Sequence, residues 1–285
     1  MKVLIPTDGS PRSIQAAALA SAMHLVDGAE ILLLGLEEPH TRREEVEASF
    51  DELRRRLSGA EVVHQKMRPG DPSRQIMLEA SENKFDIVVV GRQPKRRTTP
   101  LTRNTGTQEL TRKLASHVLL VQNPPERVRR ILVCSSGEPP SGHTLSTAGR
   151  LIAPTRASVS LIHVMSQVAL KPDSPVVELE EDADQAMENA TREGDQLKNG
   201  LHALAAGGVD SPIEPILRHG LVVDEVLEEL NDGDYDLIVL GSHYQPGLTR
   251  WMDVLLDDIT GELLNRVTCS ILIVAPVKEA RTISS

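Results

Sequence analysis

The residues of this sequence that could bind a ligand follow its apolar runs. Asp8 comes shortly after the apolar run Val3–Ile5, and a second apolar run ends at Gly91. Guanidinium and ammonium groups hold phosphate and carboxylate oxygens through charge-assisted hydrogen bonds, which salt weakens when they are exposed. The sequence therefore predicts an anion site after the second run, with a solvated basic loop as the alternative. The basic residues there are Arg92, Lys95, Arg96, Arg97 and Arg103.

Little in the sequence indicates catalysis or metal binding. Asp8 has no evident base or metal partner, and no serine lies in the Gly-x-Ser-x-Gly turn of hydrolases. Asp253, Asp257 and Asp258 share one helical face only partly, which argues against a metal cluster. We therefore expect no catalytic residue and no metal site. Cys134 and Cys269 lie in apolar runs without metal-ligand spacing, which predicts buried free thiols in a reducing compartment.

Short apolar runs alternate with helical patterns, and this order positions the polar residues. Such alternation predicts a parallel sheet covered by helices on both faces. In the first part of the chain we expect strands at residues 2–6, 30–36, 62–67, 87–90 and 118–121, with helices at 11–25, 42–57, 71–81 and 104–115.

The chain contains an internal repeat. Residues 68–91 align with residues 218–241 at a constant offset of 150 and without a gap. A period of this length is too long for a solenoid, so it indicates two copies of a whole domain. The identical pairs are Arg68/Arg218, Gly70/Gly220, Glu79/Glu229, Asp86/Asp236, Val89/Val239 and Gly91/Gly241.

The repeat predicts two domains, at residues 1–124 and 128–278. The linker Asn123–Arg127 is short, and its two prolines make it stiff. The second copy carries about 22 extra residues before its third strand, including the acidic stretch Glu178–Asp184. We expect this insertion to extend a helix towards Ala206.

Composition limits the classes of function. The net charge is −10, and the acidic excess lies in residues 126–285. An acidic half and few aromatic residues argue against a nucleic-acid surface. No apolar run approaches the ~20 residues that span a bilayer. We expect a cytoplasmic protein with no nucleic-acid or membrane partner.

Three short motifs occur in order, and their arrangement is repeated along the chain: residues 5–10 (IPTDGS), residues 70–72 (GDP) and residues 85–91 (FDIVVVG). With them, the chain from residue 1 to 276 resembles a tandem universal stress protein. The resemblance implies an α/β fold of two tandem Rossmann-like (adenine nucleotide alpha hydrolase-like) domains. Each would have a five-stranded parallel sheet of order 3-2-1-4-5 with helices on both faces. It also implies that the final strands, Val118–Val121 and Ile271–Val274, pair within the chain.

Family members that bind ATP carry the pattern Gly-x2-Gly-x9-Gly-Ser/Thr after the fourth strand, and the first copy departs from it. Pro94 replaces the second glycine and removes an N–H donor, and Asn104 replaces the third glycine, before Thr105. The resemblance implies that Asp8 contacts the ribose or adenine. With ATP as the possible ligand, the candidate nucleotide or anion site comprises Pro6, Thr7, Asp8, Leu36, Gly91, Arg92, Arg96, Arg97, Asn104 and Thr105.

The second copy departs further from the binding pattern. Ser136 stands where the first copy has Asp8, and Asp257 and Asp258 occupy the Gly-Ser position, where they would repel phosphate. His243, Tyr244 and Trp251 lie in the same loop, as packing residues or as contacts for another ligand. We expect a degenerate site here.

These observations favour a stress-associated regulatory binding protein with a weakened ATP or anion site in the first copy. The alternative is a structural, protein-interaction module that binds no nucleotide, with a protein partner or homo-oligomer. A slow ATPase is less favoured.

Overall fold

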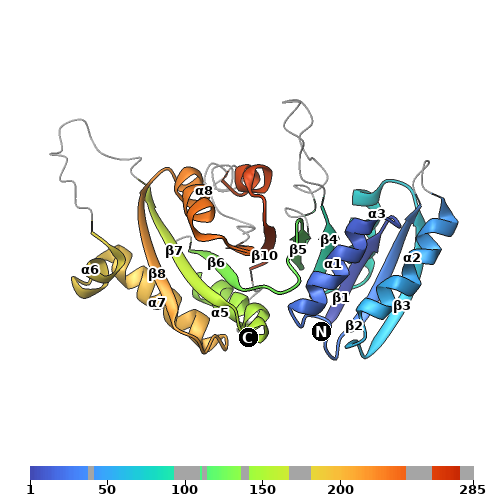
Figure 1. Ribbon diagram of the computed structural model, residues 1–285, viewed down its shortest axis with the longest axis horizontal. Helices are drawn as coiled ribbons and strands as arrows, with labels where there is room; N and C mark the ends of the chain where they lie inside the picture. Colours follow the sequence, from blue (N-terminus) through green and yellow to red (C-terminus); the bar gives the residue numbers. More distant parts are fainter. Residues whose placement is uncertain are drawn as a thin grey trace, which may run out of the picture.

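One ten-stranded sheet runs through the whole molecule, and helices cover both of its faces (Figure 1). The computed structural model describes residues 1–37, 42–92, 110, 114–135, 141–166, 181–241 and 259–276. The first half holds β1 (Lys2–Thr7), β2 (Glu30–Glu37), β3 (Val62–Pro69), β4 (Ile87–Gly91) and β5 (His117–Val121), with α1 (Pro11–Ala22), α2 (Arg43–Arg56) and α3 (Pro72–Glu82). The second half holds β6 (Arg130–Ser135), β7 (Ser158–Ser166), β8 (Ile213–Gly220), β9 (Leu237–Gly241) and β10 (Ser270–Val274), with α5 (Ser141–Ile152), the 3-10 turn η1 (Ala153–Thr155), α6 (Ala183–Glu188), α7 (Arg192–Ala206) and α8 (Val222–Gly233). Residues 259–266 are also helical.

The strand order is β3-β2-β1-β4-β5-β10-β9-β6-β7-β8, which is 3-2-1-4-5 in each half. All pairs within a half are parallel, as the alternating pattern predicts. Local signals begin the helices. Asp71, for example, accepts a hydrogen bond from the Arg74 N–H at 2.9 Å, and Pro72 occupies the first turn of α3.

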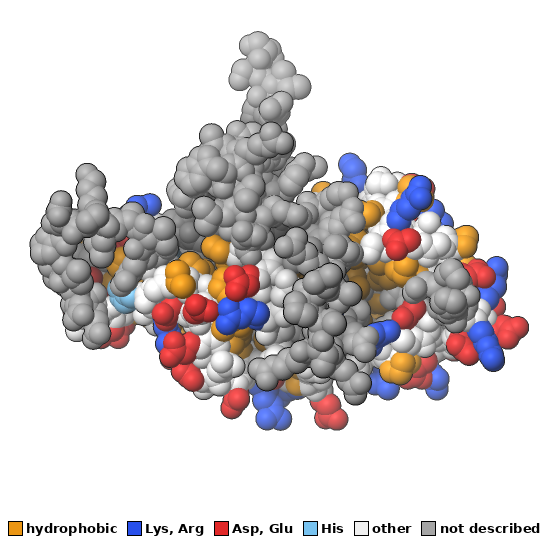
Figure 2. Space-filling model, turned by 90° about the horizontal axis from the view of Figure 1, so that it is seen from above, with side chains coloured by type: hydrophobic (Ala, Val, Ile, Leu, Met, Phe, Trp, Pro, Cys, Tyr) orange, Lys and Arg blue, Asp and Glu red, His pale blue; other side chains and the backbone are white. Residues whose placement is uncertain are grey.

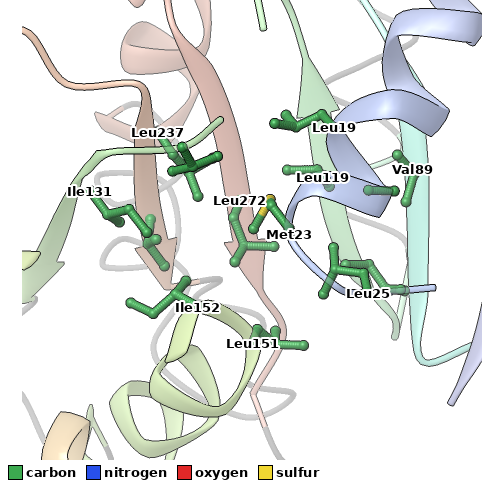
Figure 3. Packing of buried hydrophobic residues seen from close by; sticks show 14 of the residues in the cluster. Leu19, Met23, Leu25, Val89, Leu119, Ile131, Leu151, Ile152, Leu237 and Leu272 are labelled. Carbon is green, nitrogen blue, oxygen red and sulfur yellow. The ribbon is translucent and has the colours of Figure 1, made fainter. Parts of the chain in front are cut away.

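The two halves join through their last strands. β5 and β10 pair antiparallel, with Leu119 opposite Leu272, which confirms the predicted pairing and covers two sheet edges. On one face a single apolar core continues across this junction. Met23 and Leu119 of the first half lie close to Leu151 and Leu272 of the second (Figure 3).

Polar side chains flank the β5–β10 junction at one end. The side-chain amide of Gln122 donates to the carbonyls of Val267 and Cys269 at 2.7 and 2.8 Å, and Asn123 donates to that of Thr268 at 3.1 Å. The amides therefore satisfy carbonyls that follow the helix at residues 259–266, where backbone acceptors lack partners within the helix.

At the other end, His117 contributes an acid-sensitive contact. Its Nδ1 accepts a hydrogen bond from the Ala275 N–H at 3.0 Å, which requires the neutral ring. Burial lowers the pKa of His117; the nearby Asp86 acts in the opposite direction, and Arg150 reinforces the lowering. The unfolded chain therefore binds a proton at a pH where the folded chain does not.

We expect this difference to reduce stability in mild acid. The contribution of His117 is complete above the unfolded pKa of about 6.5 and is lost as the pH falls from there towards the lowered folded pKa. The free energy of unfolding should fall by up to about 1.4 kcal/mol per pH unit in this window. Urea titrations between pH 7.5 and 5.5 measure it. His117→Asn keeps an acceptor that does not titrate and should flatten the slope, whereas exposed His202→Asn should not; equal slopes would contradict the assignment.

The acidic insertion differs from its prediction. Instead of one helix reaching Ala206, α6 and α7 are separate, because Ala190 adopts φ of 52° and interrupts the helix. Thr191 then caps α7 by accepting a hydrogen bond from the Gly194 N–H at 3.2 Å. Residues 178–180 of the acidic stretch lie outside the described residues.

The identical residues of the repeat hold each half together. Arg68 at the end of β3 donates to Glu79 of α3 at 2.6 Å, and Arg218 of β8 donates to Glu229 of α8 at 2.6 Å. Glu79 is 1% exposed, so this pair ties an edge strand to the helix beneath the sheet. The repeated Arg–Glu pair is therefore a structural ion pair.

The repeated aspartates and first glycines also have structural roles. Asp86 accepts a hydrogen bond from the Lys2 N–H at 2.7 Å, and Asp236 accepts hydrogen bonds from the backbone at the start of β6. Gly70 and Gly220 have φ of 120° and 155°, values that residues with a side chain rarely adopt. These identities preserve the fold of each copy.

Candidate functional site

The first half contains a cavity of about 220 Å³ at the carboxyl ends of its strands. β1 lies between β2 and β4 in the sheet, so the chain leaves β1 in one direction and returns on its other side. In parallel α/β sheets this reversal opens the crevice where ligands bind. The lining residues are Pro6, Asp8, Ser10, Arg12, Ser13, Leu36, Pro72, Ile76, Val90 and Gly91.

The cavity has an apolar wall and a polar rim. Leu36, Ile76 and Val90 pack in or against the apolar cluster on the α3 face of the sheet. Asp8, Ser10 and Arg12 contribute the charged and hydroxyl groups. Viewed onto the carboxyl ends of the strands, hydrophobic side chains are visible among charged ones over the first half (Figure 2). Such a wall fits a flat apolar ring, and the rim fits hydroxyl or anionic groups.

Asp8 is ionised and held in place. Its Oδ1 accepts hydrogen bonds from the Ser10 N–H at 3.0 Å and the Ser10 hydroxyl at 2.5 Å, and its Oδ2 lies 3.4 Å from Arg12 Nη2. Burial acts to raise the pKa of Asp8, but the hydrogen bonds from Ser10 and the charge of Arg12 outweigh it and lower this pKa. The carboxylate therefore presents a fixed negative charge and acceptor at the rim.

Thr7 does not line the cavity. Its hydroxyl is buried and hydrogen-bonded to the hydroxyls of Ser13 at 2.8 Å and Ser49 at 3.1 Å. These hydrogen bonds link β1 to α1 and α2. Thr7 therefore helps to position the elements that surround the cavity.

Gly91 lines the cavity and also permits a close approach. A Cβ at this position would lie 2.5 Å from the Arg12 carbonyl oxygen, so β4 meets the first turn of α1 at main-chain distance. At the repeated Gly241 the nearest atom among the described residues would be Thr144 Cγ2 at 3.4 Å, an ordinary contact. Among the described residues, the close main-chain approach is thus seen at Gly91 and not at Gly241.

Arg92 points towards the second half. The residue is 8% exposed. Its Nη2 donates to the Leu264 carbonyl, and its backbone N–H donates to the Val121 carbonyl at 2.7 Å. It does not line the cavity. The other predicted residues, Arg96, Arg97, Asn104 and Thr105, lie outside the described residues.

The structure thus brings four predicted residues together and adds others. Pro6, Asp8, Leu36 and Gly91 line one cavity, although they come from three strands and the turn after β1. Ser10 and Arg12 are the added polar residues, and the signal for them was their position in the turn and first helical turn after Asp8. The first turn of a helix that follows a strand at this edge faces the crevice.

In the second half the corresponding region is mainly apolar where it is described. Cys134, Val164, Val226 and Leu240 occupy the positions of Pro6, Leu36, Ile76 and Val90 and belong to, or pack against, one apolar cluster. Cys134 and Cys269 are free, as expected, and partly buried; burial raises the pKa of each thiol to about 12. The second-copy residues that depart from the binding pattern lie outside the described residues: Ser136, His243, Tyr244, Trp251, Asp257 and Asp258.

The described residues contain neither a metal-ligand cluster nor a membrane-spanning helix. Within those ranges no group of three or more His, Cys, Asp or Glu side chains is placed to hold a metal ion. Asp253, like Asp257 and Asp258, lies outside the described residues. Among the helices that the structure describes, none combines the length and apolarity needed to cross a membrane.

Comparison with known proteins agrees with this architecture. A solved universal stress protein from Archaeoglobus fulgidus DSM 4304 has a TM-score of 0.65 at 14% identity, over 96% of this chain and 97% of that one. A putative universal stress protein from Pseudomonas aeruginosa UCBPP-PA14 has a TM-score of 0.63 at 16% identity, over 96% and 92%. The cytoplasmic domain of a prokaryotic cation chloride cotransporter has a TM-score of 0.56 at 16% identity, over 96% and 95%.

At these identities the likeness shows a shared fold. No relative was found among curated proteins. The model of the universal stress protein family matches residues 1–122 and again residues 127–275. The chain therefore belongs to the universal stress protein family and carries two copies of its domain.

Proposed function

We propose that this protein is a regulatory binding protein whose first half binds an adenine nucleotide or a related organic anion. The cavity at the ends of β1, β2 and β4 carries this proposal, because it joins an apolar wall to the fixed charges of Asp8 and Arg12. Ring and phosphate would then meet different walls of one crevice. The two universal-stress-protein-like domains correspond to residues 1–124 and 128–278.

Binding at this site is weak in our proposal. Pro94 and Asn104 stand where ATP-binding family members have glycines, so backbone N–H groups supply less of the phosphate contact. Side-chain cations, including Arg96 and Arg97, replace them. Such contacts are screened by salt, which predicts lower affinity and less selectivity among anions. The second half lacks the acid and binds no ATP.

The prediction is a thermal shift that depends on Asp8. ATP at ten times its Kd adds about 1.4 kcal/mol of stability, which raises Tm by several degrees. Asp8→Ala should remove most of this shift, measured against the variant's own unliganded Tm. Ser136→Ala changes the corresponding residue of the second half and should keep the full shift.

The absence of any shift with millimolar ATP, with or without magnesium, would exclude the nucleotide site. It would favour the second candidate function, a structural module without nucleotide. The Arg68–Glu79 and Arg218–Glu229 pairs favour that candidate, because they show that duplication preserved scaffold residues. Slow ATP hydrolysis by the first half requires that the protein forms ADP above the level of a no-protein control. The Asp8→Ala variant should abolish this ADP formation. Cytoplasmic localisation stays a prediction.

A further inference from the structure

The two ends of the ten-stranded sheet have different edges. β3 lies at one end of the strand order and β8 at the other, so each pairs with a single strand, β2 or β7 (Figure 1). The Val62 N–H donates to the Ala29 carbonyl at 3.4 Å, and the Gly70 N–H donates to the Glu37 carbonyl at 3.0 Å. Main-chain groups alternate in direction along a strand, so the odd-numbered residues between them direct their N–H and C=O groups away from β2. These residues are Val63, Gln65 and Met67.

The corresponding edge of the second half is blocked. Pro215 lies in β8 at the position of Gln65, and proline has no N–H to donate. α6 packs against the same strand, and His219 Nε2 lies 3.1 Å from the Glu181 carbonyl oxygen, shortly before this helix. A proline and a covering helix are two ways in which proteins stop an edge strand from pairing with another chain. β3 has no proline before Pro69, its last residue, so its outward donors are intact.

The cations of β3 are directed to α3, and a groove lies on the other side of the strand. Lys66 Nζ lies 2.7 Å from Glu79 Oε2, and Arg68 is held by the same carboxylate. Side chains alternate across a strand, so Gln65 and Met67 face α2. There they line a groove of about 400 Å³ together with residues of α2 that provide an apolar ring and two carboxylates: Glu47, Phe50 and Asp51. The open edge thus borders a surface that a second element can fill.

α2 carries opposite charges at its two ends. Glu44 and Glu45 lie in its first turn, whereas residues 54–56 in its last turn are all arginine. Glu47, which lines the groove, and Arg54, two turns later, lie on the same side of the helix. Because α2 connects the parallel strands β2 and β3, it runs antiparallel to them. A second α2 related by a two-fold axis beside β3 would therefore place arginines against carboxylates.

We propose that the β3 edge binds a second copy of this chain, by antiparallel pairing of the two β3 strands across a two-fold axis at Gln65. In this register Gln65 lies opposite Gln65, and Val63 lies opposite Met67 of the second copy. Each outward N–H of one strand then meets an outward carbonyl of the other. Glu47 of each copy faces Arg54 of the other, so the surface is complementary to itself in shape of pairing and in charge.

The assembly closes at two copies and is separate from the candidate ligand site. Because Pro215 and α6 block the β8 edge, each chain offers one strand for pairing among the described residues. None of the residues of the β3 surface lines the first-half cavity. The inference therefore goes beyond the proposed function, and ligand binding should not depend on the dimer.

The first test uses Gln65→Pro, with sedimentation velocity over a range of protein concentrations. The parent should form dimers, and the variant should dissociate with a Kd at least about tenfold higher, because each copy loses an N–H donor at the axis. The variant reproduces Pro215, which the corresponding strand of the second half accommodates, so circular dichroism should show an intact fold. Gln65→Ala is the matched control: it removes the side chain but keeps the N–H, and it should dimerise as the parent does.

The second test exchanges charges on α2 and does not depend on the folding of Gln65→Pro. Glu47→Arg and Arg54→Glu should each weaken the dimer, because like charges then face each other across the axis. The double variant Glu47→Arg/Arg54→Glu should restore it, because the exchange re-creates opposite charges between the copies. Asp195→Arg changes an exposed carboxylate of α7, the counterpart of α2 in the second half, and should leave the dimer unchanged.

Several results would overturn the inference. A parent protein that stays monomeric up to about 100 μM would leave the edge to an extended segment of another protein. A dimer that Gln65→Pro does not weaken would use another surface. Equal losses for Gln65→Pro and Gln65→Ala would assign the dimer to the side chain and not to strand pairing. A double charge variant that stays as weak as the single ones would contradict the two-fold arrangement of α2.

Discussion

Glu79→Ala is expected to lower the free energy of unfolding by about 1–3 kcal/mol, because it removes a buried carboxylate that accepts hydrogen bonds from two cations and an amide. Glu79 is 1% exposed, and its Oε2 lies 2.6 Å from Arg68 Nε and 2.7 Å from Lys66 Nζ. Its Oε1 accepts a hydrogen bond from Asn83 at 2.8 Å. Removing the carboxylate leaves the Asn83 amide without this acceptor and leaves Glu82 as the remaining carboxylate partner of Arg68 and Lys66. Urea denaturation followed by circular dichroism measures the change.

Two further variants show whether the ion pair is the cause. Glu44→Ala removes an exposed carboxylate from α2 and should change the free energy of unfolding by less than about 0.5 kcal/mol. The double variant Arg68→Met/Glu79→Leu replaces the pair by apolar side chains and should recover much of the loss. A Glu79→Ala effect as small as that of Glu44→Ala would show that the buried pair contributes little.

Gly91→Ala is expected to destabilise the protein by about 1–3 kcal/mol and to weaken ligand binding as well. The added Cβ would lie 2.5 Å from the Arg12 carbonyl oxygen and 2.7 Å from its carbonyl carbon. These are main-chain atoms, so the first turn of α1 must move away from β4. Ser10 and Arg12 lie in and just before this turn, so the polar rim of the cavity should shift with it. Thermal unfolding with and without ATP measures both effects.

Gly241→Ala provides the matched control in the second half. Among the residues that the structure describes, its Cβ would meet Thr144 Cγ2 alone, at 3.4 Å, a contact that needs no rearrangement. We expect a change of less than about 0.5 kcal/mol and an unaltered ATP shift. Equal losses for the two alanine variants would mean that the glycines share a backbone requirement, and that the contact with Arg12 is not the cause.

These two expectations separate the scaffold from the site. The Arg68–Glu79 pair recurs as Arg218–Glu229, so its loss should affect stability without selectivity for a ligand. Gly91 is repeated as Gly241 but meets different neighbours, so its loss should affect the first-half cavity. Identity between copies therefore marks shared architecture, and the ligand site depends on what surrounds each copy of the residue.

Much of the fold could be predicted because its signals are local. Buried parallel strands are short apolar runs, and the Asp71–Pro72 pair starts a helix wherever it lies. The prediction failed at Ala190, where a left-handed residue divides α6 from α7. Alanine has a high helix propensity, so no local signal announces this break, which is specified by the packing of two helices against β8 and each other.

The candidate site was predicted less completely. Asp8 follows β1 and Leu36 lies near the end of β2, and the family resemblance implies their place at this edge of the sheet. Arg92 follows β4 in the same way, yet its side chain lies against Leu264, which is 172 residues away in sequence. Ser10, the N-cap residue of α1, and Arg12, in the first turn of α1, complete the rim, and spacing alone does not predict this position.

The sequence by itself determined that this protein has two copies of one α/β domain, because apolar periodicity and the 150-residue offset are properties of the chain alone. It also showed that the copies differ from each other at the positions where ATP-binding family members carry glycines. The tertiary structure decided which repeated residues are scaffold and where Arg92 directs its charge. Those outcomes depend on contacts between residues distant in sequence, such as Gly91 with Arg12 and Arg92 with Leu264, and such contacts exist only once the sheet has formed.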